Sequence, residues 1–495
     1  MKVFIFTRDL RLEDNLALNE AIQSEHSDSP VYLIFQFRKQ QIGTKSDYRS
    51  DNAIEFMIES LKDLQSDIQS HGGKLFLLYE TSKKPTSGNL QLTRLLQRIS
   101  NANGKGKGKD EQGGHVFMSR GFTPFEFKRE SVLQSDLKTI GWELVLVENH
   151  TLISGTRDMR SGSGNMYPTF KPFYDRVLEA GVPSPVKLAT PKFARKLPGV
   201  GGDGNGGKGG PRPRIVSLEQ IQLGLPRERI SPGRLVSGGR KEGLKRIQLA
   251  RKEQEDYKQK RDQFSHQTSL LSAYHHFGCI SARESYHALI KIPSLTRQII
   301  WRDFAHHRIA AWGDTGWKSP TTIGDSISWK SDSRLLNAWK EGQTGVPIVD
   351  AAMRQLKQEG YIHNRGRMAV ANYLVKNLAL DWRLGERHFA QWLTDYDWSV
   401  NFMNWIGIAG ILPTDQPLRT MNPFIQANKF DKDLKYILKY IPELKGADPK
   451  EVLSQERREP IGDYPAPIVD YTESRKEYQS WARKTLMKFH PSEEV

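Results

Sequence analysis

The sequence predicts a doubly wound α/β domain at the N-terminus, followed by a mostly α-helical C-terminal domain. Short apolar runs alternate with helical patterns over the first 150 residues, and strand signals stop near residue 240. The chain has 495 residues, which is too long for one ordinary core. We therefore expect an α/β domain at 1–150, an interdomain linker at 151–240 and a helical domain at 241–485.

Five apolar runs predict buried strands in the first domain. They are KVFIF (2–6), VYLIFQF (31–37), KLFLLYE (74–80), HVFMSRG (115–121) and ELVLVEN (143–149). Residues 52–69 between the second and third runs have helical period, with one apolar face made of Ile54, Met57, Ile58, Leu61, Leu64 and Ile68. Buried strands that alternate with such helices predict a parallel sheet.

The loop after the first strand, TRDLRLEDN (7–15), lacks the G-x-G-x-x-G pattern that brings backbone close to a pyrophosphate. If a dinucleotide binds this protein, we expect its site elsewhere. Two glycine-rich tracts, at 101–114 and 199–214, read as a loop and a flexible linker, and neither is assigned a function.

Composition limits the partners and the compartment. A formal charge of +16 favours binding to a polyanion, and for a soluble protein this predicts nucleic acid. Cys279 is the only cysteine, which excludes an internal disulfide and a thiolate metal site. The N-terminus meets charge after six residues and no apolar run approaches a membrane span. We expect an intracellular monomer, in cytoplasm or nucleus, without a membrane segment.

Hydrolase and metal motifs do not occur in the sequence. The pairs His275–His276 and His306–His307 are adjacent, so on a helix their side chains diverge by about 100°. H-E-x-x-H and G-x-S-x-G are absent, and we predict no metal site. Thr268, Ser269 and Ser272 stand where a helix is expected to begin, as phosphate ligands or as an ordinary N-cap.

The segment HNRGRM (363–368) concentrates basic and amide side chains before an apolar helix. Its arginines can pair with acids, contact phosphate or form a solvated helix end, and these alternatives stay open. Asp395 is a plausible partner for Arg367. Asp397, Asn401 and Trp405 share one helical face by i, i+4 spacing.

Eight motifs in collinear order resemble the photolyase/cryptochrome flavoprotein family and are most similar to its cyclobutane pyrimidine dimer photolyases. They are FTRDLRLEDNLAL, GSGNMYPTFKPF, TSLLSAYHHFGCIS, WRDFAHH, AWKEGQTGVPIVDAAMRQL, HNRGRMAVANYLVK, LDWRLGER and NPFIQANKFD. The resemblance implies that the helical domain binds FAD. It also implies an antenna pigment in many members, a folate or a deazaflavin, and the sequence does not choose between them.

Several residues match the family's cofactor site. By this resemblance, Arg367 and Asp395 form a salt bridge beside the isoalloxazine and Asn401 lies opposite flavin N5. The residues implied to bind the cofactor are Tyr257, Thr268, Ser269, Leu271, Ser272, Arg367, Asp395, Asp397 and Asn401. Trp405, Trp382 and Trp329 match the family's electron-transfer chain, from the flavin outward. Trp392 and Trp398 have no match and are interpreted as core residues.

The residues implied to face the DNA lesion are Gln298, Trp301, Asn364, Arg365 and Met368. Two positions depart from the cyclobutane-dimer pattern: Gln298 replaces a glutamate, and Gly407 replaces a second aromatic platform. We predict a light-driven enzyme that splits cyclobutane pyrimidine dimers in damaged DNA by electron transfer from reduced FAD. The alternatives are a DASH-type single-strand photolyase, a (6-4) photolyase and a cryptochrome blue-light receptor.

Overall fold

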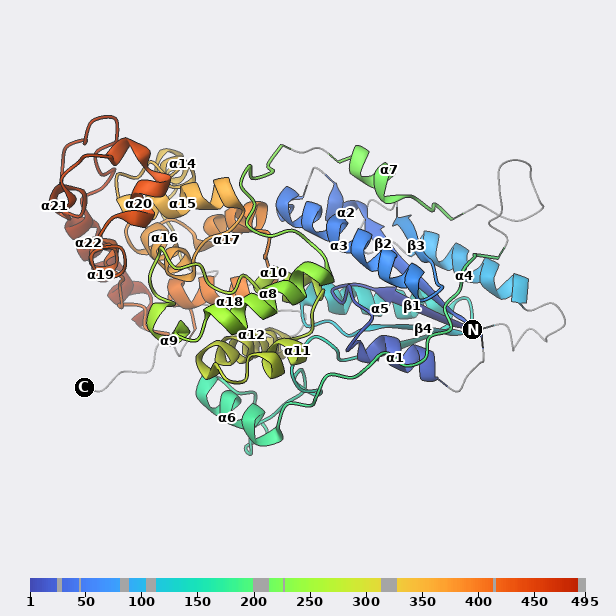
Figure 1. The fold of residues 1–495 in the computed structure, drawn as a ribbon. Helices are drawn as coiled ribbons and strands as arrows, with labels where there is room; N and C mark the ends of the chain where they lie inside the picture. The colour runs from blue at the N-terminus through green and yellow to red at the C-terminus, as the bar shows by residue number, and fades with distance from the viewer. Residues whose placement is uncertain are drawn as a thin grey trace.

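The computed structural model describes residues 1–24, 29–43, 46–80, 89–103, 113–198, 213–225, 228–312, 327–412 and 415–487. Within these ranges a sheet-containing N-terminal part lies beside a helical C-terminal part (Figure 1). The predicted fold class is confirmed. Most of the two glycine-rich tracts lies outside the described residues.

The N-terminal sheet has five parallel strands in the order β3-β2-β1-β4-β5. Every strand falls on one of the predicted apolar runs. Phe4 pairs with Leu33 on one side of the central strand and with Phe117 on the other. The chain thus starts at the centre and winds outward in both directions. The strands are β1 (Lys2–Phe6), β2 (Val31–Arg38), β3 (Leu75–Glu80), β4 (His115–Ser119) and β5 (Glu143–Val147).

Alternate strand residues supply two separate cores, one on each face of the sheet. Phe4 and Phe6 face the core under α1 and α3, whereas Val3 and Ile5 face the core under α4 and α5. The six apolar residues predicted for the face of α3 are all buried. The helices of this part are α1 (Leu16–Gln23), α2 (Lys39–Ile42), α3 (Asp51–Ser70), α4 (Leu90–Asn103) and α5 (Pro124–Lys138).

The segment that joins the two parts packs on both of them. Phe170 and Phe173 of α6 (Phe170–Ala180) share a core with Phe304 of α12 (Pro293–Trp312). α7 (Leu218–Leu223) runs along the sheet part, where Gln222 contacts Lys62 of α3. The core shared by α6 and α12 joins residues on both sides of the predicted linker boundary at 240. The boundaries 1–150, 151–240 and 241–485 stay a prediction.

The sheet core also continues into the helical part. Phe56 of α3 makes an edge contact with Tyr274 of α10 at 5.1 Å between ring centres, and Ile247 of α8 joins the same cluster. In Figure 1, α8 and α10 lie between the sheet and the C-terminal helices. The helices at this junction are α8 (Arg240–Glu253), α9 (Tyr257–Lys260), α10 (Ser272–Phe277) and α11 (Ala282–Ala288).

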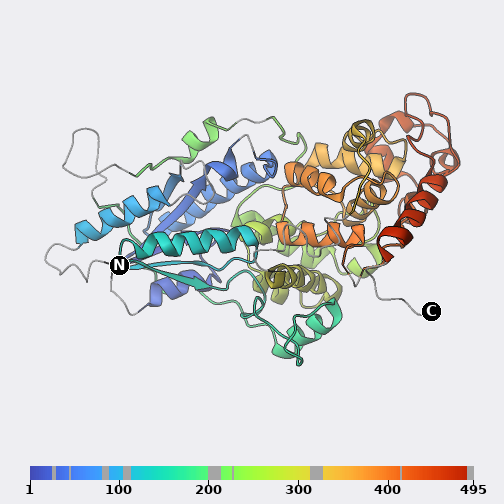
Figure 2. The same ribbon diagram turned by 180° about the vertical axis from the view of Figure 1, so that it is seen from behind.

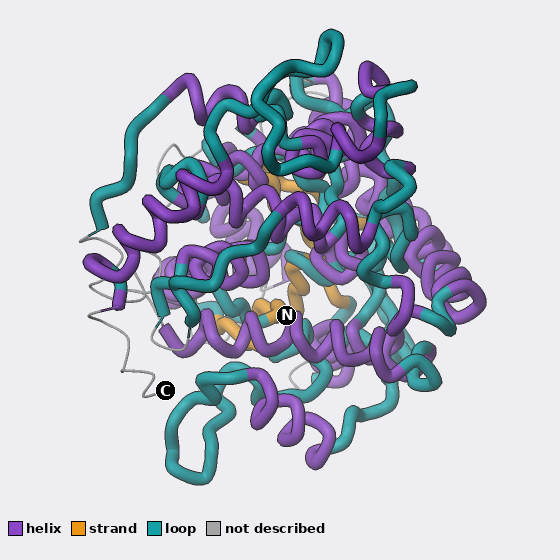
Figure 3. The backbone as a smooth tube through the Cα atoms, turned by 90° about the vertical axis from the view of Figure 1, so that its left-hand side faces the viewer, coloured by secondary structure: helices purple, strands orange, loops and turns teal. Residues whose placement is uncertain are grey.

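The largest core belongs to the C-terminal helices, which form a layered bundle (Figures 2 and 3). Its centre is built from α15 to α18, whose inward faces are almost fully buried. No helix in the described part of the chain is long and apolar enough to cross a membrane. The elements are α14 (Ser333–Glu341), α15 (Pro347–Glu359), α16 (Asn364–Lys376), α17 (Trp382–Trp392), α18 (Trp398–Ala409), α19 (Pro423–Phe430), α20 (Lys435–Tyr440), η3 (Pro442–Leu444), α21 (Pro449–Val452) and α22 (Tyr471–Thr485).

Candidate functional site

The carboxylate of Asp395 is the centre of a buried polar network. Arg367 donates through Nη2 to both carboxylate oxygens, at 3.0 and 2.9 Å, and the Ser272 hydroxyl donates to Oδ2 at 2.6 Å. Burial opposes the charge of Arg367, but the Asp395 carboxylate outweighs this effect and raises the arginine pKa. The expected partnership of Arg367 with Asp395 is confirmed.

The loop Thr268–Ser272 connects α9 to α10 and lies against this network. Its hydroxyls do not cap the helix: Leu271 is the N-cap residue without a side-chain bond, and Ser272 donates to Asp395 instead. Tyr361 lies beside Thr268 and Ser272, where burial and the Asp395 carboxylate raise the tyrosine pKa. The loop therefore presents hydroxyls and backbone N–H groups rather than an ordinary N-cap.

The same loop has the backbone geometry of an anion site. Leu270 adopts φ +54°, a left-handed conformation that costs a non-glycine residue about 1–2 kcal/mol. Leu271 follows in the right-handed helical region, and such an alternation turns successive N–H groups toward one side. Among described residues, the N–H groups of Thr268–Ser272 have no hydrogen-bond acceptor. Together with the hydroxyls, this donor set fits the phosphates of a dinucleotide such as FAD.

Two further predicted cofactor residues differ in how they are held. Tyr257 begins α9, and burial raises its pKa to about 12, so its phenol keeps its proton. Asn401 lies in α18 and donates through Nδ2 to Glu386 Oε1 at 3.1 Å, an oxygen that also accepts from the Tyr396 hydroxyl. Burial raises the pKa of Glu386, which is 2% exposed. This contact fixes the orientation of the Asn401 amide.

Asp397 has a structural role that the sequence did not reveal. Its Oδ1 accepts from two backbone N–H groups at the start of α18, and its Oδ2 lies 3.3 Å from His306 and 3.6 Å from His276. Arg8, from the loop after β1, lies 3.4 Å from the same oxygen. Burial opposes ionisation, but these groups hold the pKa of Asp397 well below its usual range. Direct contact between Asp397 and a cofactor stays a prediction.

Trp405 and Trp382 lie inside the helical core, each with 2% of its surface exposed. The two are joined through α17: a Cβ added at Gly385, three residues after Trp382, would lie 2.2 Å from the Trp405 ring. Glycine at 385 therefore lets the Trp405 ring lie directly on the α17 backbone. Trp392 and Trp398 are half-buried and pack against the same core, as their interpretation requires.

Trp329 lies outside this pair, in the segment before α14. Lys330 N donates to Ala379 O at 2.9 Å, and Lys330 pairs with Leu380 in an isolated bridge. This bridge holds half-buried Trp329 beside the turn that leads into Trp382. The three tryptophans thus run from the core toward the surface.

The residues expected to face a DNA lesion are more open. Trp301 is 43% exposed, and its ring stacks on Phe170 with 3.7 Å between centres and 6° between planes. Asn364 is exposed at the start of α16, and its Nδ2 lies 3.8 Å from Met368 Sδ one turn later. Gln298 Nε2 donates to the Ser294 carbonyl, at 3.3 Å. Trp301 and Asn364 therefore present exposed surface to a bound partner.

Arg365 is half-buried and held by several partners: Nη2 lies 2.9 Å from Asp262 Oδ2, and Nη1 donates to Gln426 Oε1 at 3.4 Å. It donates through Nε to Asp262 at 3.0 Å, and its guanidinium lies 4.6 Å from the centre of the Phe430 ring. His363 caps α16 by accepting from Arg365 N, and burial lowers the histidine pKa to about 4. His363 is therefore neutral at physiological pH.

Four contributing residues were not singled out from the sequence: Phe170, Asp262, Tyr361 and Glu386. Phe170 and Glu386 lie inside motifs that carried the family resemblance, so their position in GSGNMYPTFKPF and LDWRLGER was the available signal. Asp262 and Tyr361 had no such signal. Within the described ranges, no three His, Cys, Asp or Glu side chains are grouped to hold a metal ion.

In the described part of the chain, a doubly wound domain joined to a helical domain, with a loop of unpaired backbone N–H groups beside a buried Arg367–Asp395 pair, fits a two-domain flavoprotein class. Family models agree: the model for DNA photolyase matches residues 2–192, and the model for the FAD binding domain of DNA photolyase matches 294–484. The deoxyribodipyrimidine photo-lyase of Streptomyces griseus is 30% identical, over 96% of this chain and 98% of the relative. The chain belongs to the DNA photolyase family.

Other relatives and solved structures support the same assignment. The deoxyribodipyrimidine photo-lyase of Escherichia coli K12 is 29% identical over 95% of this chain and 96% of the relative. A class III photolyase from Agrobacterium tumefaciens matches with a TM-score of 0.80 at 28% identity, over 98% of both chains. An archaeal photolyase from Sulfolobus tokodaii, solved with two FAD molecules, has a TM-score of 0.76 at 28% identity, over 97% of this chain and 99% of that one. The predictions of a photolyase-type enzyme and of FAD as its cofactor are confirmed.

Proposed function

We propose that this protein repairs cyclobutane pyrimidine dimers in DNA by light-driven electron transfer. FAD, when bound and reduced, supplies the electron that splits the dimer and then takes it back. No net oxidation or hydrolysis results. The protein supplies binding, orientation and electrostatics.

The observation that carries the proposal is the position of α16. Its first residues include Arg367, which is anchored to Asp395 on the cofactor side, and also exposed Asn364 and half-buried Arg365 and Met368. One helix end therefore links the cofactor network to an exposed polar surface. A dimer that flips out of the duplex and enters here can contact both the network and the exposed surface.

The cofactor end of the site is proposed to use the donors described above. Backbone N–H groups of Thr268–Ser272 and the hydroxyls of Thr268 and Ser269 would hold the phosphates, and the Asn401 amide, fixed by Glu386, would lie at the flavin ring. An amide at this position has no proton to give up, unlike a carboxylic acid. This favours an unprotonated reduced ring, which is the form suited to electron donation.

The substrate end favours a cyclobutane dimer over a (6-4) lesion. A (6-4) reaction is expected to need a histidine that can act as a proton donor beside the lesion. His363 is buried, accepts from Arg365 N and has a pKa of about 4, so it cannot donate a proton at neutral pH. Trp301 instead offers an exposed ring on which a thymine can stack.

The exposed lesion side and the charge of +16 support a nucleic-acid substrate. A specific departure favours a second candidate function. At Gly407, an added Cβ would have only Asp415 within 4 Å among described residues, so no aromatic platform occupies this position. A receptor that senses blue light without repairing DNA would tolerate this open position.

One experiment tests both candidates. The reduced holoprotein is irradiated with oligonucleotides that carry one cyclobutane dimer or one (6-4) lesion, each single- and double-stranded, and repaired sites are counted. We expect repair of the cyclobutane dimer, and a strong preference for single strands would assign the DASH-type variant. Normal photoreduction without repair of any substrate would overturn the proposal in favour of the receptor.

A further inference from the structure

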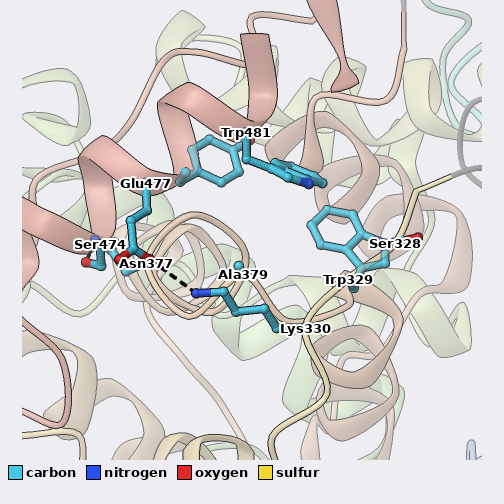
Figure 4. Close-up of a pocket in the computed structure, with 9 residues that line it drawn as sticks. Ser328, Trp329, Lys330, Asn377, Ala379, Ser474, Glu477 and Trp481 are labelled. Carbon is cyan, nitrogen blue, oxygen red and sulfur yellow. Dashed lines mark hydrogen bonds and ion pairs between the residues drawn. The ribbon is translucent and has the colours of Figure 1, made fainter. Parts of the chain in front are cut away.

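A cavity of about 340 Å³ opens beside Trp329, between the 328–330 segment and α22. Figure 4 shows the ring of Trp481, from α22, beside the ring of Trp329 at this cavity. The two ring centres are 5.4 Å apart with 45° between the planes. Lys330 and Glu477 form an ion pair of 3.2 Å across the same opening.

We propose that Trp481 is the outermost member of the tryptophan relay and exchanges electrons there with small reductants from solvent. The proposal rests on the proposed function, because it requires Trp405, Trp382 and Trp329 to carry electrons toward the flavin. It adds a residue from the last described helix, far in sequence from the other three, and assigns a use to the cavity.

The surroundings of the Trp329 indole N–H favour passing the oxidised state on to Trp481. The indole Nε1 of Trp329 is buried and contacts no acceptor among the described residues. A tryptophan that loses an electron becomes a strong acid, and it persists best where its N–H proton can leave. Both half-buried rings line the open cavity, but only Trp329 has an Nε1 that is buried without an acceptor among the described residues. Transfer of the oxidised state from Trp329 to Trp481 is therefore downhill once the proton is released.

Tyr478 is the other aromatic residue at the cavity, and it is unsuited to the same task. Its ring centre lies 5.6 Å from that of Trp481, but its hydroxyl donates to the Pro417 carbonyl at 3.1 Å, and burial raises the tyrosine pKa. Lys376 Nζ also lies 5.7 Å from the ring centre, and a nearby cation makes a ring harder to oxidise. The relay therefore ends at Trp481.

The electrons and protons balance as follows. Trp481 gives one electron to oxidised Trp329 and releases its Nε1 proton to water. A thiol from solvent then returns one electron and one proton to Trp481 and becomes a thiyl radical. Two such thiyl radicals combine to a disulfide, so each pair of turnovers consumes two thiols. The cavity is large enough for a small thiol to approach the exposed edge of the indole.

The test compares the oxidised holoprotein with the variant Trp481→Phe under flash illumination, with dithiothreitol as the thiol. We expect the tryptophan radical signal in transient absorption to decay severalfold faster in the variant, because the charge stays nearer the flavin. Photoreduction should also need severalfold more dithiothreitol. The variant Trp481→Tyr, which keeps an oxidisable ring, should recover part of both losses.

A second readout locates the radical without measuring activity. A nitroso spin trap forms a covalent adduct with a tryptophan radical, and peptide mass spectrometry identifies the modified residue. We expect the adduct on Trp481 in the wild type and its loss in Trp481→Phe. The matched control is Trp392→Phe, which removes another half-buried ring that packs against the core. This control should leave the adduct on Trp481.

The variant Trp382→Phe separates failure of this inference from failure of the relay itself. Slow photoreduction in Trp382→Phe with an unchanged radical lifetime and no adduct on Trp481 would overturn the assignment of Trp481 alone. Unchanged photoreduction in Trp382→Phe would overturn the relay, and the role of Trp481 with it. Slower photoreduction in both Trp382→Phe and Trp481→Phe, together with the adduct on Trp481 in the wild type, would support the extended chain.

Discussion

The cofactor side and the lesion side of this site are built in opposite ways. On the cofactor side, Asp395 is 6% exposed and accepts from Arg367 and Ser272 at once. On the lesion side, Trp301 is 43% exposed, and Arg365 pairs with Asp262, which is itself partly exposed. The difference indicates that the protein prepares the cofactor position in advance and leaves the lesion position adaptable.

The largest effect should follow from breaking the cofactor side. Asp395→Asn leaves the Arg367 guanidinium without its counterion, which should cost about 3 kcal/mol of unfolding free energy and remove most of the bound FAD. Urea unfolding and flavin absorbance measure the two effects. In the control Glu179→Gln, an exposed pair with Arg176 is lost, and the change should stay under about 1 kcal/mol. Equal effects in the two variants would contradict the buried network.

The next effect should come from the lesion side, with a smaller loss of stability because the Arg365–Asp262 pair is partly exposed. Arg365→Ala removes a guanidinium that can bind a dimer or its phosphate, and should weaken binding to damaged DNA by about 1–3 kcal/mol. Undamaged DNA should be affected less. A salt series on matched oligonucleotides, with and without one cyclobutane dimer, measures both affinities.

The matched control for Arg365 is Arg214→Gln, at the end of the glycine-rich tract, where the guanidinium lies over Tyr79. Its effect should be weak, should not discriminate damaged from undamaged DNA and should fade with salt. Lys208 and Arg212, predicted to behave likewise, lie outside the described residues. Equal weakening of both DNAs by Arg365→Ala would remove Arg365 from the lesion site.

A smaller effect on DNA binding should follow when an aromatic ring is added to the lesion side at Gly407. Gly407→Tyr places a ring where the neighbourhood is open, and a stacked base should gain about 1 kcal/mol of binding. Replacing glycine within α18 should also stabilise the helix by about 0.5–1 kcal/mol. We expect tighter binding to duplex DNA with a cyclobutane dimer. Weaker binding with unchanged stability would show that Gly407 provides space that the lesion needs.

The smallest effect concerns the pH dependence of the cofactor side. The folded state raises the pKa of Glu386 above its ordinary value of 4.5, so the native protein holds a proton that the unfolded chain releases. Wild-type stability should therefore fall as pH rises from about 4.5 through the folded pKa. Glu386→Gln keeps the acceptor for Asn401 and Tyr396 and should remove this loss. Urea unfolding at several pH values measures how the unfolding free energy changes with pH. If the wild type and Glu386→Gln lose stability in parallel as pH rises, the proton is held by another group.

The sequence by itself determined the fold class. All five strands fall on the predicted short apolar runs, and β1 to β4 are buried, because a strand covered on both faces must be continuously apolar. The prediction of a buried strand was wrong for β5, which lies at the edge of the sheet and is only half-buried. The six residues predicted for the buried face of α3 are buried because helical period alone fixes which side chains share a face. The pair Arg367–Asp395 was also foreseen, since a charge next to an apolar helix needs a partner.

The tertiary structure decided what each polar residue does, because hydrogen-bond partners come from segments that are distant in the chain. Ser272 and Thr268 could equally have been N-caps, and only the packing of α10 against Asp395 shows that they are not. The tertiary structure also gives Asp397 a role at the start of α18 and in a contact with Arg8 from the first domain, while its contact with a cofactor stays a prediction. Trp481 is more than 150 residues away from Trp329 in sequence, and the position of α22 alone brings their rings together. Local pattern fixes which side chains are buried; which groups meet there depends on how the elements pack.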